Sequence, residues 1–265
     1  MPRAAGLYYE VHGPSGAPRL ILSSGLGGSA SYWAPNLEPL ARSYGVLAYD
    51  HRGTGRSDRD VPGDLTIEAM ARDLILLLDA VDWPSATIVG HALGGMIGMA
   101  LAIAEPARVD QLVAVNCWAG LDPHTARCFD TRLALLRDSG VRAFVHAQPI
   151  FLYPAAWISA HHARLMEEEE QQLADFAGAE MTRRRIAAAR RFNPGERLRG
   201  IAAPTLLMSA EDDMLVPAHC SAALARTISQ AQHARMSAGG HACNVTHADH
   251  FNMWLIDWLD AAQGE

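Results

Sequence analysis

The stretch Gly90-His91-Ala92-Leu93-Gly94 follows the pattern Gly-x-Ser-x-Gly, but it carries alanine where the pattern has serine. In that pattern a sharp turn between a strand and a helix holds a serine hydroxyl beside a histidine and a set of oxyanion-binding donors. Alanine can neither attack a substrate nor be protonated. The stretch therefore predicts a strand-turn-helix unit whose chemistry lacks a covalent step, or an enzyme that a substitution has disarmed.

The residues on either side of this turn support the predicted unit. Ala86-Thr87-Ile88-Val89 is short, apolar and typical of a buried strand, and residues 96–104 have a helical composition that ends near Pro106. Similar apolar runs alternate along the chain with segments of helical period, which favours an α/β fold with a mostly parallel central sheet flanked by helices. Further strands are expected at 45–49, 111–116 and 205–209, and further helices at 66–80 and 251–261.

Two local features refine this prediction. Residues 6–12 and 19–23 are separated by the turn cluster Gly13-Pro14-Ser15-Gly16-Ala17-Pro18, which predicts a hairpin. About ninety residues separate the strands expected at 111–116 and 205–209, and their period is largely helical. We therefore predict a core of residues 1–118 and 198–265, with residues 119–197 inserted between two strands as a helical cap over an enclosed site.

Composition excludes several classes of function. The net charge of −7 gives no electrostatic reason to bind nucleic acid or an anionic membrane. No segment reaches the roughly 20 apolar residues of a membrane-spanning helix, and no signal-peptide core follows Met1, so a cytoplasmic protein is expected. The chain contains no lysine, which rules out Schiff-base chemistry and a P-loop.

Neither a metal nor a cofactor is predicted. The four cysteines form no Cys-x-x-Cys pair, and the adjacent residues His161 and His162 would diverge on a helix. The acidic run 167–170 and the arginines 183–185 are interpreted as a solvated helix face with opposite charges.

Five landmarks occur in an order that suggests acid-base chemistry. The motif at 90–94 is preceded by Ser23-Ser24-Gly25-Leu26-Gly27-Gly28 and by residues 50–57, and it is followed by Ala210-Glu211-Asp212-Asp213 and by Gly239-Gly240-His241. Nucleophile position, acid, then histidine is the chain order of α/β-hydrolase triads. Over its whole length the chain resembles the α/β-hydrolases.

Within that superfamily the chain is similar to the RutD family, hydrolases of a bacterial uracil-degrading pathway. The similarity lies in Gly90 to Met96, in Gln148-Pro149-Ile150-Phe151-Leu152-Tyr153-Pro154 and in residues 239–246. The resemblance implies a carbon-nitrogen hydrolase that acts on carbamate or 3-aminoacrylate, small anions that bear an amino group. Both are expected to break down slowly unaided, so a serine is not required.

The candidate site residues follow from the landmarks. His241 is predicted to be the general base and acid, oriented by Asp213, which stands four residues before Pro217 as the family's acid does. The backbone N–H groups of Leu26 and Leu93 are the candidate oxyanion donors. Ser24 could line the pocket, and Ser24 or Cys243 could replace the missing nucleophile. Asn116 and Trp118, which end the strand before the insertion, are candidates to face the site.

Two other functions stay open at this point. The chain could be a serine esterase or amidase whose nucleophile was engineered to alanine, Ala92. It could also be a non-catalytic relative that binds a small molecule, although retained Asp213 and His241 argue against this. The expected partner is a small-molecule substrate, and the expected assembly is a monomer or homodimer.

Overall fold

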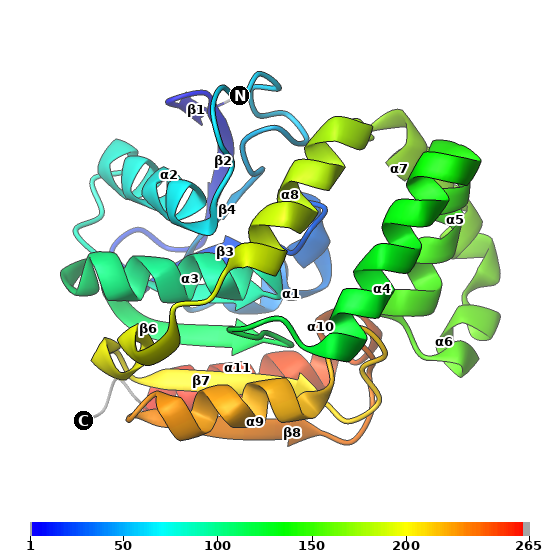
Figure 1. The fold of residues 1–265 in the computed structure, drawn as a ribbon. Helices are drawn as coiled ribbons and strands as arrows, with labels where there is room; N and C mark the ends of the chain where they lie inside the picture. Colours follow the sequence, from blue (N-terminus) through cyan, green and yellow to red (C-terminus); the bar gives the residue numbers. More distant parts are fainter. Residues whose placement is uncertain (1, 262–265) are drawn as a thin grey trace.

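The computed structural model describes residues 2–261 and contains one eight-stranded sheet in the order β1-β2-β4-β3-β5-β6-β7-β8 (Figure 1). Only the β1–β2 and β2–β4 pairs are antiparallel. The sheet confirms the predicted α/β class. The strands are β1 (Arg3–Ala4), β2 (Leu7–His12), β3 (Arg19–Ser23), β4 (Gly45–Tyr49), β5 (Ala86–His91), β6 (Val109–Val115), β7 (Thr205–Ala210) and β8 (Ala231–Met236).

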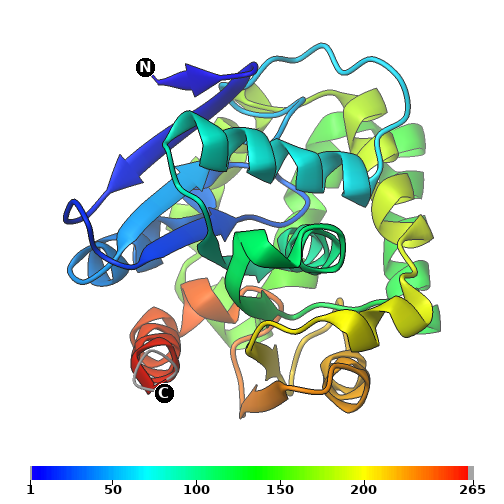
Figure 2. The same cartoon turned by 90° about the vertical axis from the view of Figure 1, so that its left-hand side faces the viewer.

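Residues alternate between the two faces of the sheet, and each face has its own apolar core. On β3, Ile21 belongs to one core, whereas Leu20 and Leu22 belong to the other. This is the two-residue period of a strand that is buried on both faces. One core is completed by α2 (Ile67–Ala80), α3 (Leu93–Ala104) and α9 (Ala218–Thr227), and the other by α1 (Ala34–Ala41), α10 (Cys243–Thr246) and α11 (Ala248–Ala261) (Figure 2).

The helix α2 begins as its sequence predicts. The side chain of Thr66 accepts a hydrogen bond from the Ala69 N–H, so Thr66 is the N-cap. Leu74, Leu77 and Leu78 on its inner face are fully buried. The strand and helix predicted around residue 92 are also confirmed, because β5 ends at His91 and α3 begins at Leu93.

The hairpin predicted for residues 6–23 is wrong. β4 lies between β2 and β3, pairing antiparallel with β2 and parallel with β3. A Gly- and Pro-rich cluster ensures that the chain turns, but it does not choose the strand that pairs. β3 carries three buried apolar residues in a row, and a strand in the middle of the sheet buries them between two parallel neighbours, β4 and β5.

Five helices follow β6 and precede β7, and they lie to one side of the sheet (Figure 1). We call them the helical insertion. They are α4 (Pro123–Ala134), α5 (Gly140–Leu152), α6 (Ala155–Ala160), α7 (His162–Ala174) and α8 (Ala179–Arg191). They fall within the range 119–197, and the division into core and cap stays a prediction; residues 1 and 262–265 of the predicted core lie outside the described residues.

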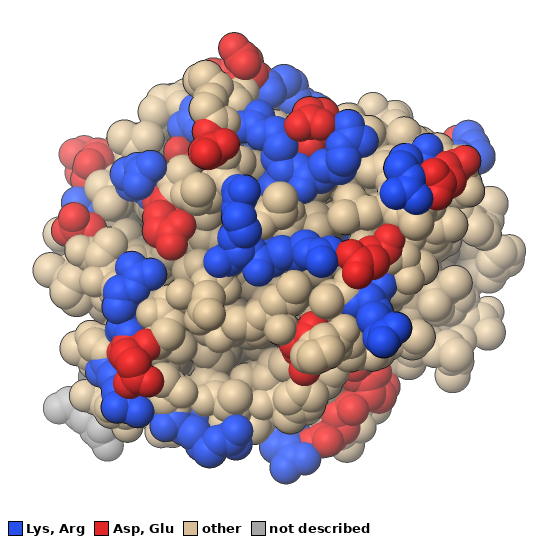
Figure 3. Space-filling view, in the orientation of Figure 1, with Lys and Arg blue, Asp and Glu red and all other residues tan. Residues whose placement is uncertain are grey.

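Charged residues of both signs lie among one another on the face seen in Figure 3, and the blue side chains gather around α8. Several arginines of α8 bind core backbone, among them Arg184 and Arg191. No helix within residues 2–261 has both the length and the apolar composition needed to cross a membrane.

Candidate active site

The turn at residue 92 has a strained backbone that its neighbours enforce. Ala92 has φ +48° and ψ −110°, a conformation that costs a non-glycine residue about 1–3 kcal/mol. A Cβ on Gly94 would lie 2.0 Å from the Ser23 carbonyl oxygen, and one on Gly90 would lie 2.3 Å from the Gly94 carbonyl carbon. Only glycine fits at either position, so the two glycines of the motif allow the strand, the helix and the loop after β3 to meet at Ala92.

His241 and Asp213 form a buried pair. His241 Nδ1 lies 2.8 Å from Asp213 Oδ2, and the two residues are 2% and 8% exposed. The other carboxylate oxygen of Asp213 accepts hydrogen bonds from the N–H groups of Leu215 and Val216. These bonds fix the carboxylate, which in turn holds the proton on His241 Nδ1 and leaves Nε2 as the ring nitrogen that can accept a proton.

The His241 loop is held by two side chains, one beside Ala92 and one at the end of β6. His91 Nε2 donates to the His241 carbonyl oxygen at 2.8 Å, and the His91 and His241 rings are 4.7 Å apart. Asn116 Nδ2 donates to the same carbonyl at 2.7 Å. Burial, reinforced by His241, holds the pKa of His91 well below its ordinary value, so His91 is neutral and keeps the proton on Nε2 that this hydrogen bond needs.

The predicted oxyanion donors lie on the two segments that meet at this turn. Leu93 is the first residue of α3, where a backbone N–H has no intrahelical acceptor. Leu26 follows β3, in a loop so close to the turn that a Cβ on Gly25 would lie 2.8 Å from His91 Nδ1. Ser24 is 1% exposed and its hydroxyl has no partner among the described residues.

The two candidates for a substitute nucleophile are placed differently. Cys243 is fully buried and its Sγ lies 3.6 Å from Asn116 Nδ2. Burial raises the pKa of the Cys243 thiol to about 12, so the reactive thiolate is scarce at neutral pH. Ser24 precedes the Gly25–Leu26 loop, and no histidine within residues 2–261 forms a hydrogen bond with its hydroxyl.

Arg185 corrects the interpretation of residues 183–185 as a solvated face. Its side chain is 1% exposed, and its Nε donates to the Leu26 carbonyl oxygen at 2.8 Å. A run of three arginines suggests a solvated face, but consecutive helical residues point in different directions. Of the three, Arg183 is exposed, Arg184 is half-buried and Arg185 is buried. The sequence carries no signal for which of them is buried.

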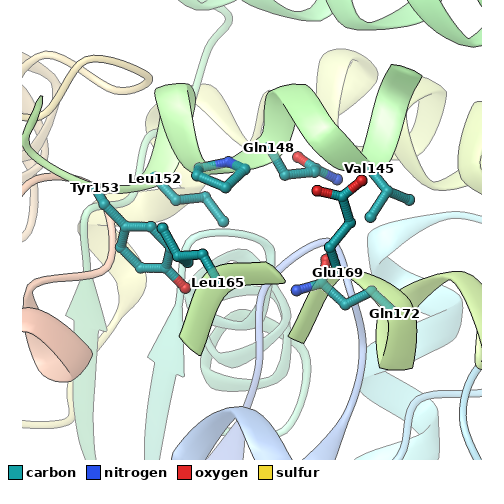
Figure 4. Close-up of a pocket in the computed structure, with 8 residues that line it drawn as sticks. Val145, Gln148, Leu152, Tyr153, Leu165, Glu169 and Gln172 are labelled. Carbon is teal, nitrogen blue, oxygen red and sulfur yellow. The ribbon is translucent and has the colours of Figure 1, made fainter. Parts of the chain in front are cut away.

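A small cavity lies within the helical insertion, between α5 and α7, and is separate from the His241–Asp213 pair (Figure 4). Its volume of about 10 Å³ holds a single water molecule. None of the predicted site residues lines it. The lining residues are Val145, Gln148, Pro149, Leu152, Tyr153, Leu165, Glu169 and Gln172.

One group of potential metal ligands is found among residues 2–261, formed by Asp122, His219 and Cys220. Its atoms already serve the fold, because Asp122 caps α4 through the His124 N–H and pairs with His219 Nε2 at 2.9 Å. Burial raises the pKa of the Cys220 thiol to about 12, which disfavours the thiolate that a metal requires.

Known proteins similar to this chain point to one family. Residues 18–139 match the family model described as alpha/beta hydrolase fold. Proteins named "Putative carbamate hydrolase RutD" are 50% identical in Variovorax paradoxus and 48% identical in Caulobacter segnis. The similarity covers 96% of both chains in the first comparison and 97% of both in the second.

Solved structures agree on the fold. The enol-lactonase from Burkholderia xenovorans LB400 superposes with a TM-score of 0.87 at 26% identity, over 97% of this chain and 98% of that one. A hydrolase from Pseudomonas aeruginosa PA01 gives 0.85 at 27% identity, over 96% and 94%. The chain is a hydrolase that belongs to the RutD family of the α/β-hydrolase fold.

Proposed function

We propose that this protein breaks the carbon-nitrogen bond of carbamate and releases ammonia, without a covalent intermediate. The observation that carries the proposal is the buried pair of His241 and Asp213 beside a turn whose nucleophile position is Ala92. Relatives named as carbamate hydrolases supply the substrate class. The acid-base machinery is complete, whereas the group that would form an acyl-enzyme is absent.

The chemistry needs one proton transfer and one bond cleavage. Protonated His241 donates from Nε2 to the carbamate nitrogen, which becomes an ammonium group still bonded to the carboxylate. The carbon-nitrogen bond then breaks with its electron pair going to nitrogen, and ammonia and carbon dioxide leave. The N–H groups of Leu26 and Leu93 bind the carboxylate oxygens throughout.

The sizes of the rate effects in serine hydrolases indicate that such a substrate does not need a serine. Removing the nucleophile of a serine hydrolase costs about 10⁶ in turnover, yet about 10³ to 10⁴ over the uncatalysed reaction remains from binding and oxyanion stabilisation. That remainder is negligible for a stable amide. For a carbamate, which decomposes unaided, it is a useful acceleration.

3-Aminoacrylate is the second substrate that the proposal includes, within a uracil-degrading pathway. Protonation of its enamine gives an iminium ion, and water activated by His241 then attacks the iminium carbon before ammonia leaves. Both substrates are small carboxylates with an amino group. We further propose that the helical insertion is the cap that encloses them, in a cytoplasmic monomer or homodimer that needs no nucleic-acid or membrane partner.

The test is turnover of each substrate generated in solution, with ammonia release followed in the presence and absence of the protein. Acceleration that disappears in His241→Gln supports the proposal. If His241→Gln releases ammonia as fast as the unchanged protein, the pair is not catalytic and a binding function takes precedence. Stoichiometric labelling of the unchanged protein by a serine-trapping phosphonate would contradict the non-covalent route.

The variant Ala92→Ser distinguishes this proposal from the alternative hypothesis of a serine hydrolase whose nucleophile has been replaced by alanine. The turn already has the backbone that a nucleophilic serine requires, so the variant tests only the chemistry. A large gain in p-nitrophenyl acetate hydrolysis identifies a disarmed esterase. An unchanged rate supports a site built for a substrate that needs no nucleophile.

A further inference from the structure

We propose that Arg185 is the positioning residue of the anion-binding site: it orients the Leu26 N–H from the helical insertion, and its unpaired charge makes the site selective for carboxylates. The inference deepens the proposed function, and it rests on that function for the oxyanion role of Leu26. It concerns binding, so it can be tested without turnover.

Arg185 is a buried cation without a counter-ion. Its side chain is 1% exposed, and within residues 2–261 no carboxylate lies at ion-pair distance from it. Burying a charge without a partner is unfavourable, and a fold tolerates it where a ligand supplies the opposite charge. Burial lowers the pKa of Arg185 to about 10, so the guanidinium is still charged at neutral pH.

The hydrogen bonds of Arg185, together with a turn bond from the Gly28 N–H to the Gly25 carbonyl oxygen at 3.1 Å, orient the peptide that carries the Leu26 N–H. Arg185 Nη2 donates to the Gly25 carbonyl oxygen at 3.2 Å, and Nε donates to the Leu26 carbonyl oxygen at 2.8 Å. The Gly25 carbonyl and the Leu26 N–H belong to one planar trans peptide, in which they point in opposite directions. A guanidinium that holds the carbonyl therefore aims the N–H away from itself, and it polarises the peptide so that the N–H is a stronger donor.

A neutral histidine, His51, also accepts a hydrogen bond from the Arg185 guanidinium and helps to fix its position. Arg185 Nη2 donates to His51 Nδ1 at 2.8 Å, and His51 Nε2 lies 3.3 Å from the Ser23 hydroxyl. Burial, and then the charge of Arg185, holds the pKa of His51 well below its ordinary value. His51 therefore accepts a hydrogen bond from Arg185 without cancelling its charge.

Two buried polar groups at this loop have no partner among the described residues. Arg185 Nη1 donates to nothing, and the Ser24 hydroxyl, one residue before Gly25, is also unpartnered. Both groups can donate, and unpartnered buried donors are costly in a folded protein. A carboxylate bound at the Leu26 N–H, on the other side of the peptide from the guanidinium, supplies the negative charge that this buried site lacks, whereas an uncharged amide supplies none.

The arrangement links the site to the helical insertion. Arg185 lies on α8, and 160 residues separate it from Gly25 in the loop after β3. Figure 1 shows α8 running from the other helices of the insertion toward the core. The anion site is therefore complete only when α8 is seated on the core.

The first experiment measures acetate binding by titration calorimetry. Acetate carries the carboxylate of the proposed substrates but no scissile bond. Arg185→Gln is expected to weaken acetate binding about 10- to 100-fold, the range of one or two hydrogen bonds to a charged group. Arg185→Lys keeps the charge but not the forked geometry, and we expect an intermediate loss.

Arg184→Gln is the matched control. Arg184 is the neighbouring residue on α8 and also docks the helix to core backbone, through Nη1 to the Val61 carbonyl oxygen at 2.8 Å. It is half-buried and does not touch the Gly25–Leu26 loop. We expect acetate affinity within about twofold of the unchanged protein. An equal loss in both variants would show that Arg185 merely docks α8, and would overturn the inference.

Two measurements on the unchanged protein keep the inference testable if the Arg185 variants do not fold. Acetate should bind at least about tenfold more tightly than acetamide, which has the same shape without the charge. Acetate should also shift the amide proton resonance of Leu26. Equal binding of acetate and acetamide, or an unmoved Leu26 resonance, contradicts the inference. Neither measurement involves turnover. The result for Arg185 and the result for carbamate turnover are therefore independent, and either can fail without the other.

Discussion

His241 Nδ1 and Asp213 Oδ2 lie 2.8 Å apart, and the Asp213 carboxylate is itself held by the N–H groups of Leu215 and Val216. The imidazole therefore has one tautomer and one orientation before substrate arrives. A site that needs only a proton shuttle depends on this relationship more than on the residue at position 92.

Asp213→Asn should lower turnover of the proposed substrate about 10²- to 10⁴-fold, because the amide no longer fixes the tautomer or stabilises the protonated ring. Ammonia release at saturating substrate measures the effect. The control is Asp212→Asn, since Asp212 is the adjacent acid and its Oδ1 accepts from the Gly240 N–H. A larger loss in Asp212→Asn would move the acid role to that residue.

Ala92→Gly tests whether the turn holds strained backbone without a chemical role for its side chain. Glycine relieves an unfavourable φ and ψ worth about 1–3 kcal/mol. This gain offsets two losses, the burial of the alanine methyl group and the larger backbone entropy that glycine loses on folding. We expect the free energy of unfolding in urea to stay the same or to rise by up to about 1 kcal/mol. Turnover should stay within a few-fold.

Ala100→Gly is the comparison, because Ala100 has similar burial but lies in the interior of α3. There the same substitution should lower the free energy of unfolding by about 1–2 kcal/mol. Equal losses at the two positions would mean that the turn at Ala92 is not strained.

The sequence predicts the parts of the fold and site that short-range rules control. The two glycines of the motif are required by contacts within a few residues and by one neighbouring loop, so their spacing reveals the turn. Thr66 is recognisable as a helix cap because it bonds to Ala69, three residues away. Asp213 is identified as the partner of His241 by its position four residues before Pro217, the spacing of the family's acid, because a local turn sets the position of its carboxylate.

The parts that sequence analysis missed depend on contacts between distant residues. Arg185 is one of three successive arginines, and only the docking of α8 on a loop 160 residues away in the sequence makes it buried. β8 was not predicted because Ala231–Met236 mixes polar and apolar residues at the edge of the sheet, where one side needs no partner. Pairing of β2 with β4 likewise follows from the whole sheet and not from the turn after β2.

Acid should destabilise the protein through His91. Its pKa in the folded state lies well below the unfolded value of about 6.5, so below that pH the unfolded chain binds a proton that the folded protein refuses. The contribution of His91 to the free energy of unfolding is fully present above pH 6.5 and is lost as the pH decreases. This contribution therefore falls progressively as the pH is lowered from 6.5 to 5.

His91→Gln retains a donor near the Nε2 position and removes the titration. Its free energy of unfolding in urea should therefore fall less between pH 6.5 and 5 than that of the unchanged protein. His162→Gln, at an exposed position on α7, serves as the control and should follow the unchanged protein. Parallel curves for His91→Gln and the unchanged protein would show that His91 takes up its proton in the folded state.

Asn116 organises the His241 loop, and replacing it should damage the site as well as the fold. Its Nδ2 donates to the carbonyl oxygens of His241 and Gly240, and its Oδ1 accepts from the Ala210 N–H. Asn116→Asp has the same shape but places an oxygen against two carbonyl oxygens. We expect a loss of about 2–4 kcal/mol in unfolding free energy and a fall in turnover at saturating substrate.

Asn252→Asp distinguishes damage to the site from general destabilisation. Asn252 is also buried, and it lies on α11, where its Nδ2 donates to the Pro35 carbonyl oxygen and its Oδ1 accepts from Asn36. None of these hydrogen bonds reaches residues 239–242. Both variants should unfold at lower urea concentration, whereas only Asn116→Asp should lose turnover when assayed well below its unfolding transition. If turnover falls equally in both, Asn116 contributes stability alone, and His241 is held in place by His91 and Asp213 without it.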